Sequence, residues 1–117
     1  MGAFARKPMD RFEWERIIRR LRIPAKDKYL ALMLATYAES DGSRVFPGVD
    51  RLALVMCTGT ATVKRQLATL RDLGLVERVK QGNRHAGLAD EYRLTIPLNL
   101  SDFPMLTPEE QARSGDQ

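Results

Sequence analysis

The stretch CTGTATVKRQLATLRDLGLVERVKQGNRHAGLADEYRLTI, residues 57–96, changes its hydrophobic period once. Apolar residues recur at helical spacing from 60 to 73, and they alternate at a spacing of two in the segments that follow. Gly59 is an acceptable N-cap for a helix, and Gly74 is typical of the position just past a helix end. The stretch therefore predicts a helix over 60–73 followed by two antiparallel strands of a hairpin.

The predicted helix over 60–73 has two distinct faces. A rotation of about 100° per residue puts Val63, Leu67, Leu70 and Gly74 on one stripe, which we expect to be buried. A second face, centred about 130° from the stripe, carries small, polar and basic side chains. It consists of Thr60, Ala61, Lys64, Arg65 and Ala68.

A shorter helix is expected just before this one. Val49, Leu52, Ala53 and Met56 have helical spacing, and the tripeptide 57–59 separates them from the helix that begins at 60. Two short helices joined by three residues are typical of a helix-turn-helix.

Two further helices are expected upstream. Asp10 and Glu13 have the spacing of a capping box, which predicts the start of an amphipathic helix over 10–21. Pro24 can begin a second helix, which is apolar on most sides and is therefore expected at the centre of the domain. Together the elements predict a mainly α fold with a small β-hairpin, a winged helix-turn-helix.

The polar face of the 60–73 helix has the composition that reading DNA in the major groove requires. Lys and Arg donate to guanine or phosphate, Thr bonds base edges or phosphate, and an alanine methyl contacts the thymine methyl. The helix N-terminus can also face phosphate, since no carboxylate lies near it. The alternative is an ordinary solvated helix face. The residues expected to read DNA are Thr60, Ala61, Thr62, Lys64 and Arg65, with phosphate contacts from Thr58, Gly59 and Arg51.

The connection between the two strands, residues 81–90, is longer than a tight turn needs and carries Arg84 and His85 at its tip. In a winged helix this tip lies beside the recognition helix, where a cation reaches an adjacent minor groove or phosphate. A flexible, solvated loop is the alternative. The expected wing contacts are Lys80, Asn83, Arg84 and His85.

The segment FPGVDRLALVMCTGTATVKRQLATLRDLGLVERV, residues 46–79, resembles the winged helix-turn-helix domains common in small proteins of bacterial plasmids, phages and other mobile elements. The resemblance extends through YLALMLATYAESDG upstream and ADEYRLTIP downstream, and it covers residues 14–97. It implies binding of duplex DNA, as a regulator or as part of a replication initiator, through the recognition residues named above. The chain departs from the pattern at Cys57, where relatives usually have glycine, and at Gly59 and Thr60, where they often have serine and arginine.

Composition narrows the classes of function. Outside residues 101–117 the chain has 18 basic and 11 acidic residues, an excess that attracts polyanions, nucleic acid foremost and anionic membrane surfaces on charge alone. A lone cysteine excludes an intramolecular disulfide, and we expect a cytoplasmic protein without a membrane segment. Cys57 could be a redox sensor or a partly buried structural thiol. With one histidine and no phosphate-binding loop, no catalytic site, metal, cofactor or small-molecule ligand is expected.

The chain is expected to divide into a flexible N-terminal arm (1–9), the winged helix-turn-helix domain (10–98) and an acidic tail (99–117) that is either disordered or a short helix starting near Thr107. The first helix offers more apolar surface than simple docking needs, which suggests a homodimer. The expected dimer contacts are Phe12, Trp14, Ile17 and Ile18, and packing onto the second helix is the alternative.

The sequence thus predicts a protein that binds double-stranded DNA sequence-specifically, as a transcriptional regulator such as a repressor. One alternative is a plasmid or phage replication or partition protein, which would use the same surface. An alternative of another class is a winged helix that binds proteins and no DNA.

Overall fold

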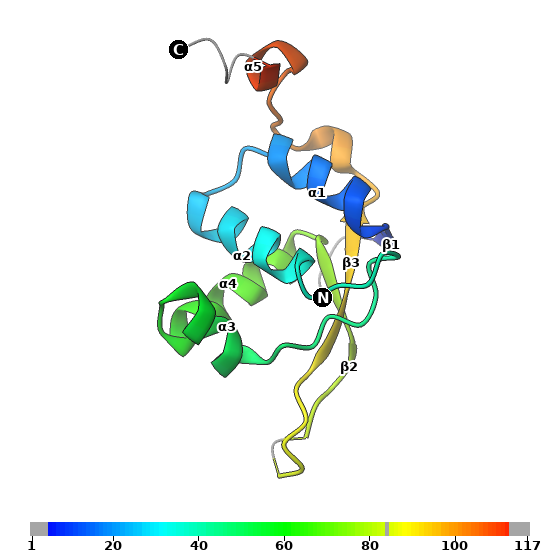
Figure 1. Ribbon diagram of the computed structural model, residues 1–117. Helices are drawn as coiled ribbons and strands as arrows, with labels where there is room; N and C mark the ends of the chain where they lie inside the picture. The colour runs from blue at the N-terminus through cyan, green and yellow to red at the C-terminus, as the bar shows by residue number, and fades with distance from the viewer. Residues whose placement is uncertain (1–4, 84, 113–117) are drawn as a thin grey trace.

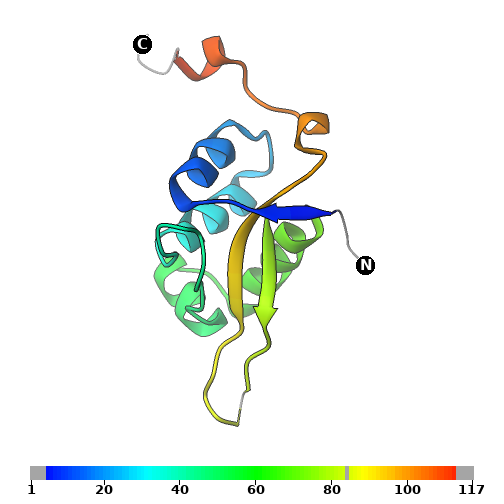
Figure 2. The ribbon, with the colours of Figure 1, turned by 90° about the vertical axis from the view of Figure 1, so that its right-hand side faces the viewer.

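The computed structural model of the chain describes residues 5–83 and 85–112 (Figure 1). The main helices pack on one side of a small antiparallel sheet, and the β2–β3 hairpin extends beyond them (Figures 1 and 2). The predicted class is confirmed, with a three-stranded sheet in the order β1-β3-β2. The elements are β1 (Arg6–Pro8), α1 (Arg11–Arg20), α2 (Ala25–Ala35), α3 (Val49–Met56), α4 (Thr60–Asp72), β2 (Val76–Lys80), β3 (Glu91–Pro97), the 3-10 helix η1 (Leu100–Asp102) and α5 (Pro108–Ala112).

The start of α1 follows from its N-cap. The Asp10 carboxylate accepts hydrogen bonds from the backbone N–H groups of Phe12 and Glu13, both at 3.0 Å. The Glu13 carboxylate pairs with Arg16 at 3.1 Å. Only the Asp10 half of the predicted capping box is therefore formed, and it suffices to begin the helix where the sequence predicted it.

The helix-turn-helix is closed by a left-handed residue at Cys57, whose φ is 58° and ψ 46°. Two backbone hydrogen bonds end α3 there: Cys57 N–H donates to Leu54 O at 3.2 Å, and Thr58 N–H donates to Ala53 O at 2.9 Å. This is the Schellman arrangement, in which glycine normally takes the left-handed position. The Cys57 side chain is exposed, so the expectation of a partly buried thiol is wrong.

The end of α4 has the same arrangement with glycine in the left-handed position. Gly74 has a φ of 81°, its N–H donates to Arg71 O, and Leu75 N–H donates to Leu70 O, both at 3.0 Å. The apolar stripe of α4 is buried as predicted, with Val63, Leu67 and Leu70 at most 3% exposed. The helix is therefore closed and packed by the residues that the sequence indicated.

The bond from Leu75 N–H to Leu70 O leaves a gap in the β ladder. Thr95 N–H donates to Leu75 O at 2.9 Å, but the Leu75 N–H that would normally answer Thr95 O is used by the helix end. The indole N–H of Trp14 fills this gap, since it lies 2.8 Å from Thr95 O and 3.0 Å from Leu75 O. A buried side chain of α1 thus joins the end of α4 to both strands of the hairpin.

The first helix does not present the expected dimer surface. Trp14 and Ile18 are fully buried within their own chain, in the core that α1 shares with α2 and β3. Ile17 is partly buried, and Phe12 is exposed. The assignment of Trp14 and Ile18 as dimer contacts is therefore wrong, because burial against α2 and β3 satisfies their apolar surface.

The N-terminal segment is not a free arm over its described part. Arg6–Pro8 form β1, antiparallel to β3 with Lys7 opposite Ile96, and Met9 N–H donates to Leu94 O at 3.2 Å. Since β3 is buried, it needs pairing on both edges, and a three-residue edge strand has no hydrophobic pattern to reveal it. The prediction of a flexible arm is wrong for residues 6–8, while residues 1–4 lie outside the described residues.

Gly42 allows the N-terminal segment to approach the sheet. Its φ is 85°, and a Cβ at this position would lie 2.1 Å from Met9 O. Its carbonyl accepts a hydrogen bond from Leu94 N–H at 2.8 Å, and Val45 forms a bridge with Tyr92. The loop before α3 therefore covers the lower half of the same β3 edge that β1 covers above.

The residues after β3 also belong to the folded body. Arg22 N–H donates to Pro104 O at 3.0 Å and Leu106 N–H donates to Arg20 O, so this segment is held against the end of α1. A capping box then forms between Thr107 and Glu110, and α5 begins where the sequence suggested a short helix. A tail boundary at 99 is therefore too early, and residues 113–117 lie outside the described residues.

We predict that Cys57→Gly stabilises the protein. A left-handed conformation costs a residue with a Cβ about 1–2 kcal/mol, whereas the extra unfolded-state entropy of glycine costs about 0.5–1 kcal/mol. The net gain should be roughly 0.5–1 kcal/mol, measured as a higher urea midpoint with an unchanged slope. Cys57→Ala keeps the Cβ and serves as the control; an equal gain in that variant would attribute the effect to the thiol.

We also predict that Trp14→Phe destabilises the protein, by about 2 kcal/mol or more, because Thr95 O loses its donor and the core loses volume. Chemical denaturation measures the loss. An unnatural benzothienyl side chain at position 14 keeps the shape of the ring without the N–H, and we expect it to destabilise as well. Unfolding at the parent's urea midpoint would show that the indole hydrogen bond contributes nothing.

Candidate nucleic-acid interface

The second face of α4 is open to solvent, as the sequence predicted. Thr60, Ala61, Lys64 and Arg65 are exposed, and Thr62 is partly buried. The face exists because the opposite side of the same helix is anchored in the core, so the helix cannot turn these residues inward.

The N-terminus of α4 is uncapped by any side chain within the described part of the chain. Gly59 is the N-cap with extended backbone, and the first turn contains no acidic residue. The first hydrogen bond into the helix is from Val63 N–H to Gly59 O at 3.2 Å. The N–H groups before it therefore point outward with the positive end of the helix dipole, which favours an anion.

The two cations of this face differ in their freedom. Arg65 Nη2 lies 3.4 Å from Thr62 Oγ1, a weak contact that still orients the guanidinium along the helix. No hydrogen bond or ion pair of Lys64 is formed among residues 5–83 and 85–112. The ammonium of Lys64 is thus available to a partner.

The base of the wing is fixed by Asp90, which sequence reasoning did not single out. One carboxylate oxygen accepts a hydrogen bond from Gly82 N–H at 2.6 Å, and the other pairs with Arg78 at 3.3 Å. A Cβ on Gly82 would lie 2.3 Å from Leu88 O, so the two arms of the wing approach more closely than any other residue would permit. An acidic residue just before a strand, opposite a glycine, was the available signal.

The tip of the wing is built by Asn83. Its backbone N–H and O both bond Leu88 at 2.9 Å, and its side-chain oxygen accepts from the N–H groups of His85 and Ala86 at 2.9 and 3.2 Å. The amide oxygen of Asn83 is therefore occupied by the turn, and the residue positions the tip. Lys80 and His85 are exposed, and Arg84 lies outside the described residues.

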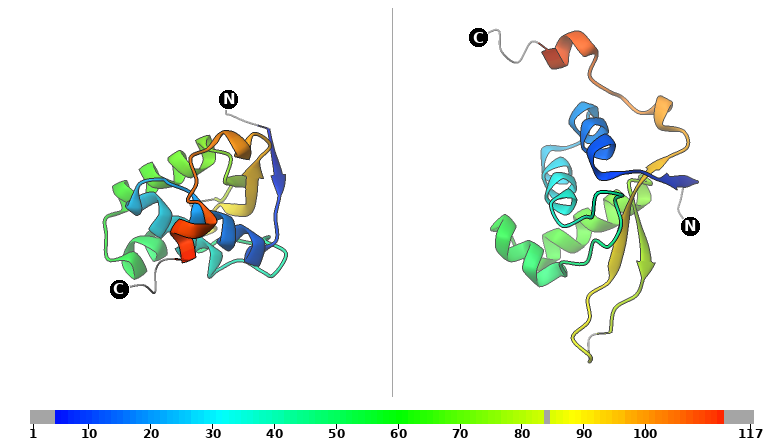
Figure 3. Two further views of the ribbon diagram at one scale, coloured as in Figure 1. Left: turned by 90° about the horizontal axis from the view of Figure 1, so that it is seen from above. Right: turned by 45° about the vertical axis from the view of Figure 1, so that its right-hand side comes forward.

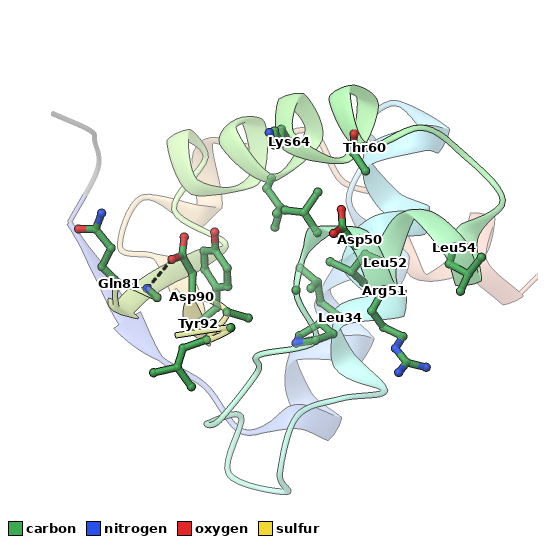
Figure 4. A pocket seen from close by; sticks show the side chains of 18 residues that line it. Leu34, Asp50, Arg51, Leu52, Leu54, Thr60, Lys64, Gln81, Asp90 and Tyr92 are labelled. Atoms are coloured by element: carbon green, nitrogen blue, oxygen red, sulfur yellow. Dashed lines mark hydrogen bonds between the residues drawn. The ribbon is translucent and has the colours of Figure 1, made fainter. Parts of the chain in front are cut away.

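A cleft of about 1030 Å³ separates α3 and α4 from the wing. In the close-up, Thr60 and Lys64 of α4 lie along one wall and Asp90 and Tyr92 lie across from them (Figure 4). Figure 3 (right) shows the wing extending below the α3–α4 pair, which leaves this side of the molecule open. The fold thus brings the recognition helix and the wing to one concave surface.

The cleft has mixed charge. Besides Lys64, it is lined by Arg51 and Asp50 from the first turn of α3 and by Asp90 from the wing. Burial, and then the nearby Asp90 carboxylate, raise the pKa of Tyr92, while Arg71 acts in the opposite direction. The Tyr92 hydroxyl therefore stays protonated at neutral pH and remains a hydrogen-bond donor.

Two exposed leucines stand on the cleft. Leu54 of α3 is 74% exposed and Leu88 of the wing is 60% exposed, and both line the cleft. Single exposed leucines are ordinary on a protein surface, but Leu88 is held by the paired backbone bonds to Asn83. Sequence reasoning missed both residues, because an isolated leucine in a loop or on a helix is expected to be buried.

The expected site residues therefore fall into groups. Thr60, Lys64 and Arg51 line the cleft. Ala61 and Arg65 lie on the exposed α4 face outside the cleft lining, and Thr58 and Gly59 are exposed in the turn before α4. Among the described residues, no cluster of three His, Cys, Asp or Glu side chains could hold a metal ion. None of the described helices is long and apolar enough to cross a bilayer.

Comparison with known families finds one matching model, described as a helix-turn-helix domain, over residues 14–76. The match begins at Trp14 and ends at the first residue of β2, so it includes the α3–turn–α4 unit and excludes the wing. No curated protein and no solved structure matches the chain. Since the matched residues are more than half of the chain and form the helices described above, the protein belongs to this helix-turn-helix domain family.

Proposed function

We propose that the protein binds duplex DNA sequence-specifically as a transcriptional regulator of the winged helix-turn-helix type. The observation that carries the proposal is the shared concave surface, with the small, cationic face of α4 on one side and the wing on the other. An α-helix fits the major groove, while a hairpin beside it reaches an adjacent groove or the phosphates.

In this arrangement each part of α4 has a distinct role. Lys64 and Arg65 donate to guanine or to phosphate, and the Ala61 methyl contacts a thymine methyl. The free N–H groups near Gly59 face a backbone phosphate, with Thr58 beside them. Arg51, Lys80 and His85 supply further phosphate contacts around the groove, and Asn83 holds the wing tip in place.

Asp50 and Asp90 bear on specificity. Carboxylates repel phosphate, and they accept a hydrogen bond from the amino group of cytosine. Asp90 is committed to the wing base, whereas Asp50 is exposed at the start of α3. A base edge next to Asp50 is therefore favoured over a backbone phosphate.

The resemblance to proteins of plasmids, phages and mobile elements supports the same DNA-binding surface in a replication or partition protein. Such a protein would bind iterated repeats cooperatively, whereas a repressor binds at a promoter. Footprinting on DNA from the protein's own genomic neighbourhood separates the two. With Trp14 and Ile18 buried, the proposal concerns one domain on its site and does not require a homodimer.

A protein-interaction module is the second candidate, and the exposed Leu54 and Leu88 favour it, because apolar side chains at a cleft suit a protein partner. Retention of a protein partner together with failure to bind any duplex at low salt would establish it.

We predict that Lys64→Ala and Arg65→Ala each lower affinity for the preferred duplex by about 1–3 kcal/mol, roughly 5- to 150-fold, if the side chain contacts a base. The duplex is selected from a random library, and affinity is measured by fluorescence anisotropy at fixed salt. Arg16→Ala removes the same charge from an arginine already paired with Glu13 and is the control. Parent-like affinity in both α4 variants would exclude α4 as the reading helix.

We further predict that Leu88→Ala weakens DNA binding roughly 3- to 10-fold without changing its dependence on salt, because the lost contact is apolar and releases no counterions. Leu98→Ala is the matched control, since Leu98 is 63% exposed and lies after β3, away from the wing. An equal effect of the two substitutions, or a changed salt slope, would remove Leu88 from the interface.

A further inference from the structure

The corner between α1 and α2 is strongly basic and takes no part in the surface described above. Between positions 19 and 28 the chain carries five cations and one carboxylate, Asp27. These residues form the end of α1, the connection and the first turn of α2. The cations are Arg19, Arg20, Arg22, Lys26 and Lys28.

Two of the five cations are used by the fold. Arg20 donates to Leu106 O through Nε and Nη2 at 3.3 and 3.2 Å, and Lys28 Nζ donates to Arg19 O at 3.0 Å. Both bonds satisfy carbonyl groups at ends of chain segments, which is a structural role.

The other three, Arg19, Arg22 and Lys26, are exposed, and we refer to them as the basic corner. None of them forms an ion pair with a residue of the described ranges. By contrast, Arg11, Arg16 and Arg44 pair with glutamates at 2.9, 3.1 and 3.4 Å. The basic corner thus concentrates uncompensated positive charge, which a polyanion would relieve.

The backbone of the basic corner is held in place. Leu21 forms a bridge with Met105, and Arg22 N–H donates to Pro104 O at 3.0 Å. A rigid backbone lowers the entropy lost when side chains on it engage a ligand. Tyr29, 46% exposed and one turn after Lys26, adds a hydroxyl of the kind that bonds to phosphate.

The basic corner lies away from the cleft. In Figure 1, α1 and its connection to α2 lie above α3 and α4, while the wing reaches the opposite end of the molecule. A duplex seated on α4 and the wing would leave the basic corner uncovered. Resting on the proposed function, we propose that the basic corner binds the phosphodiester backbone of a second duplex segment, so that one molecule bridges two segments of DNA.

The test measures energy transfer between two short duplexes, one with a donor and one with an acceptor dye, mixed with the protein. The parent should bring them together. Arg19→Gln/Arg22→Gln/Lys26→Gln should abolish the transfer while affinity for a single preferred duplex stays within about twofold. Losing three phosphate contacts should also reduce the salt slope of bridging by roughly 3.

The control is Arg11→Gln/Arg16→Gln/Arg44→Gln, which removes the same net charge from arginines that are paired with glutamates and should keep bridging. Thermal unfolding of both triple variants verifies that each is folded. Persistent bridging in the basic-corner variant would overturn the proposal, since a dimer with one duplex per copy gives that result. A loss of single-duplex affinity as large as in the Lys64 and Arg65 variants would also overturn it, by placing the basic corner in the first interface.

The proposed function fails separately. If the Lys64 and Arg65 variants bind every duplex like the parent, α4 is not the reading surface. The basic-corner variant would then still report whether duplex is held at the α1–α2 end.

Discussion

The indole N–H of Trp14 completes a β ladder that the end of α4 interrupts, and the relative placement of α4 and the hairpin depends on it. The helix end takes the Leu75 N–H, which leaves Thr95 O without its strand partner. Trp14 supplies the missing donor from α1 and is itself fully buried. An unsatisfied buried carbonyl would cost about 1–3 kcal/mol, so the three elements are held in one arrangement.

That arrangement positions the candidate interface. Two helix ends with the same hydrogen-bond pattern, at Cys57 and Gly74, set the start and the end of α4 relative to its neighbours. Beyond the core, the wing has its own internal supports, Asp90 at the base and Asn83 at the tip. The exposed face of α4 and the wing therefore form a preorganised surface, which lowers the entropy lost on binding a rigid duplex.

Most of the fold could be predicted from local signals. The bounds of α1, α3 and α4 follow from Asp10, from the break at 57–59 and from Gly74, because caps and left-handed positions act within a few residues. The strand β1 could not be predicted, since its three residues carry no apolar alternation and are ordered by the β3 edge. The burial of Trp14 and Ile18 was also missed, because an apolar helix face looks the same whether its own chain or a second copy covers it.

For the candidate site, the sequence by itself determined which residues of α4 face outward, because helical periodicity and the buried stripe of Val63, Leu67 and Leu70 leave only one polar face. Only the tertiary structure decided what lies across from that face. The roles of Asp90, Asn83 and Leu88 depend on contacts between residues that close the wing, and the position of the wing depends on a hydrogen bond between residues 14 and 95. Such pairings between distant residues have no period along the chain, so they arise only when packing brings the segments together.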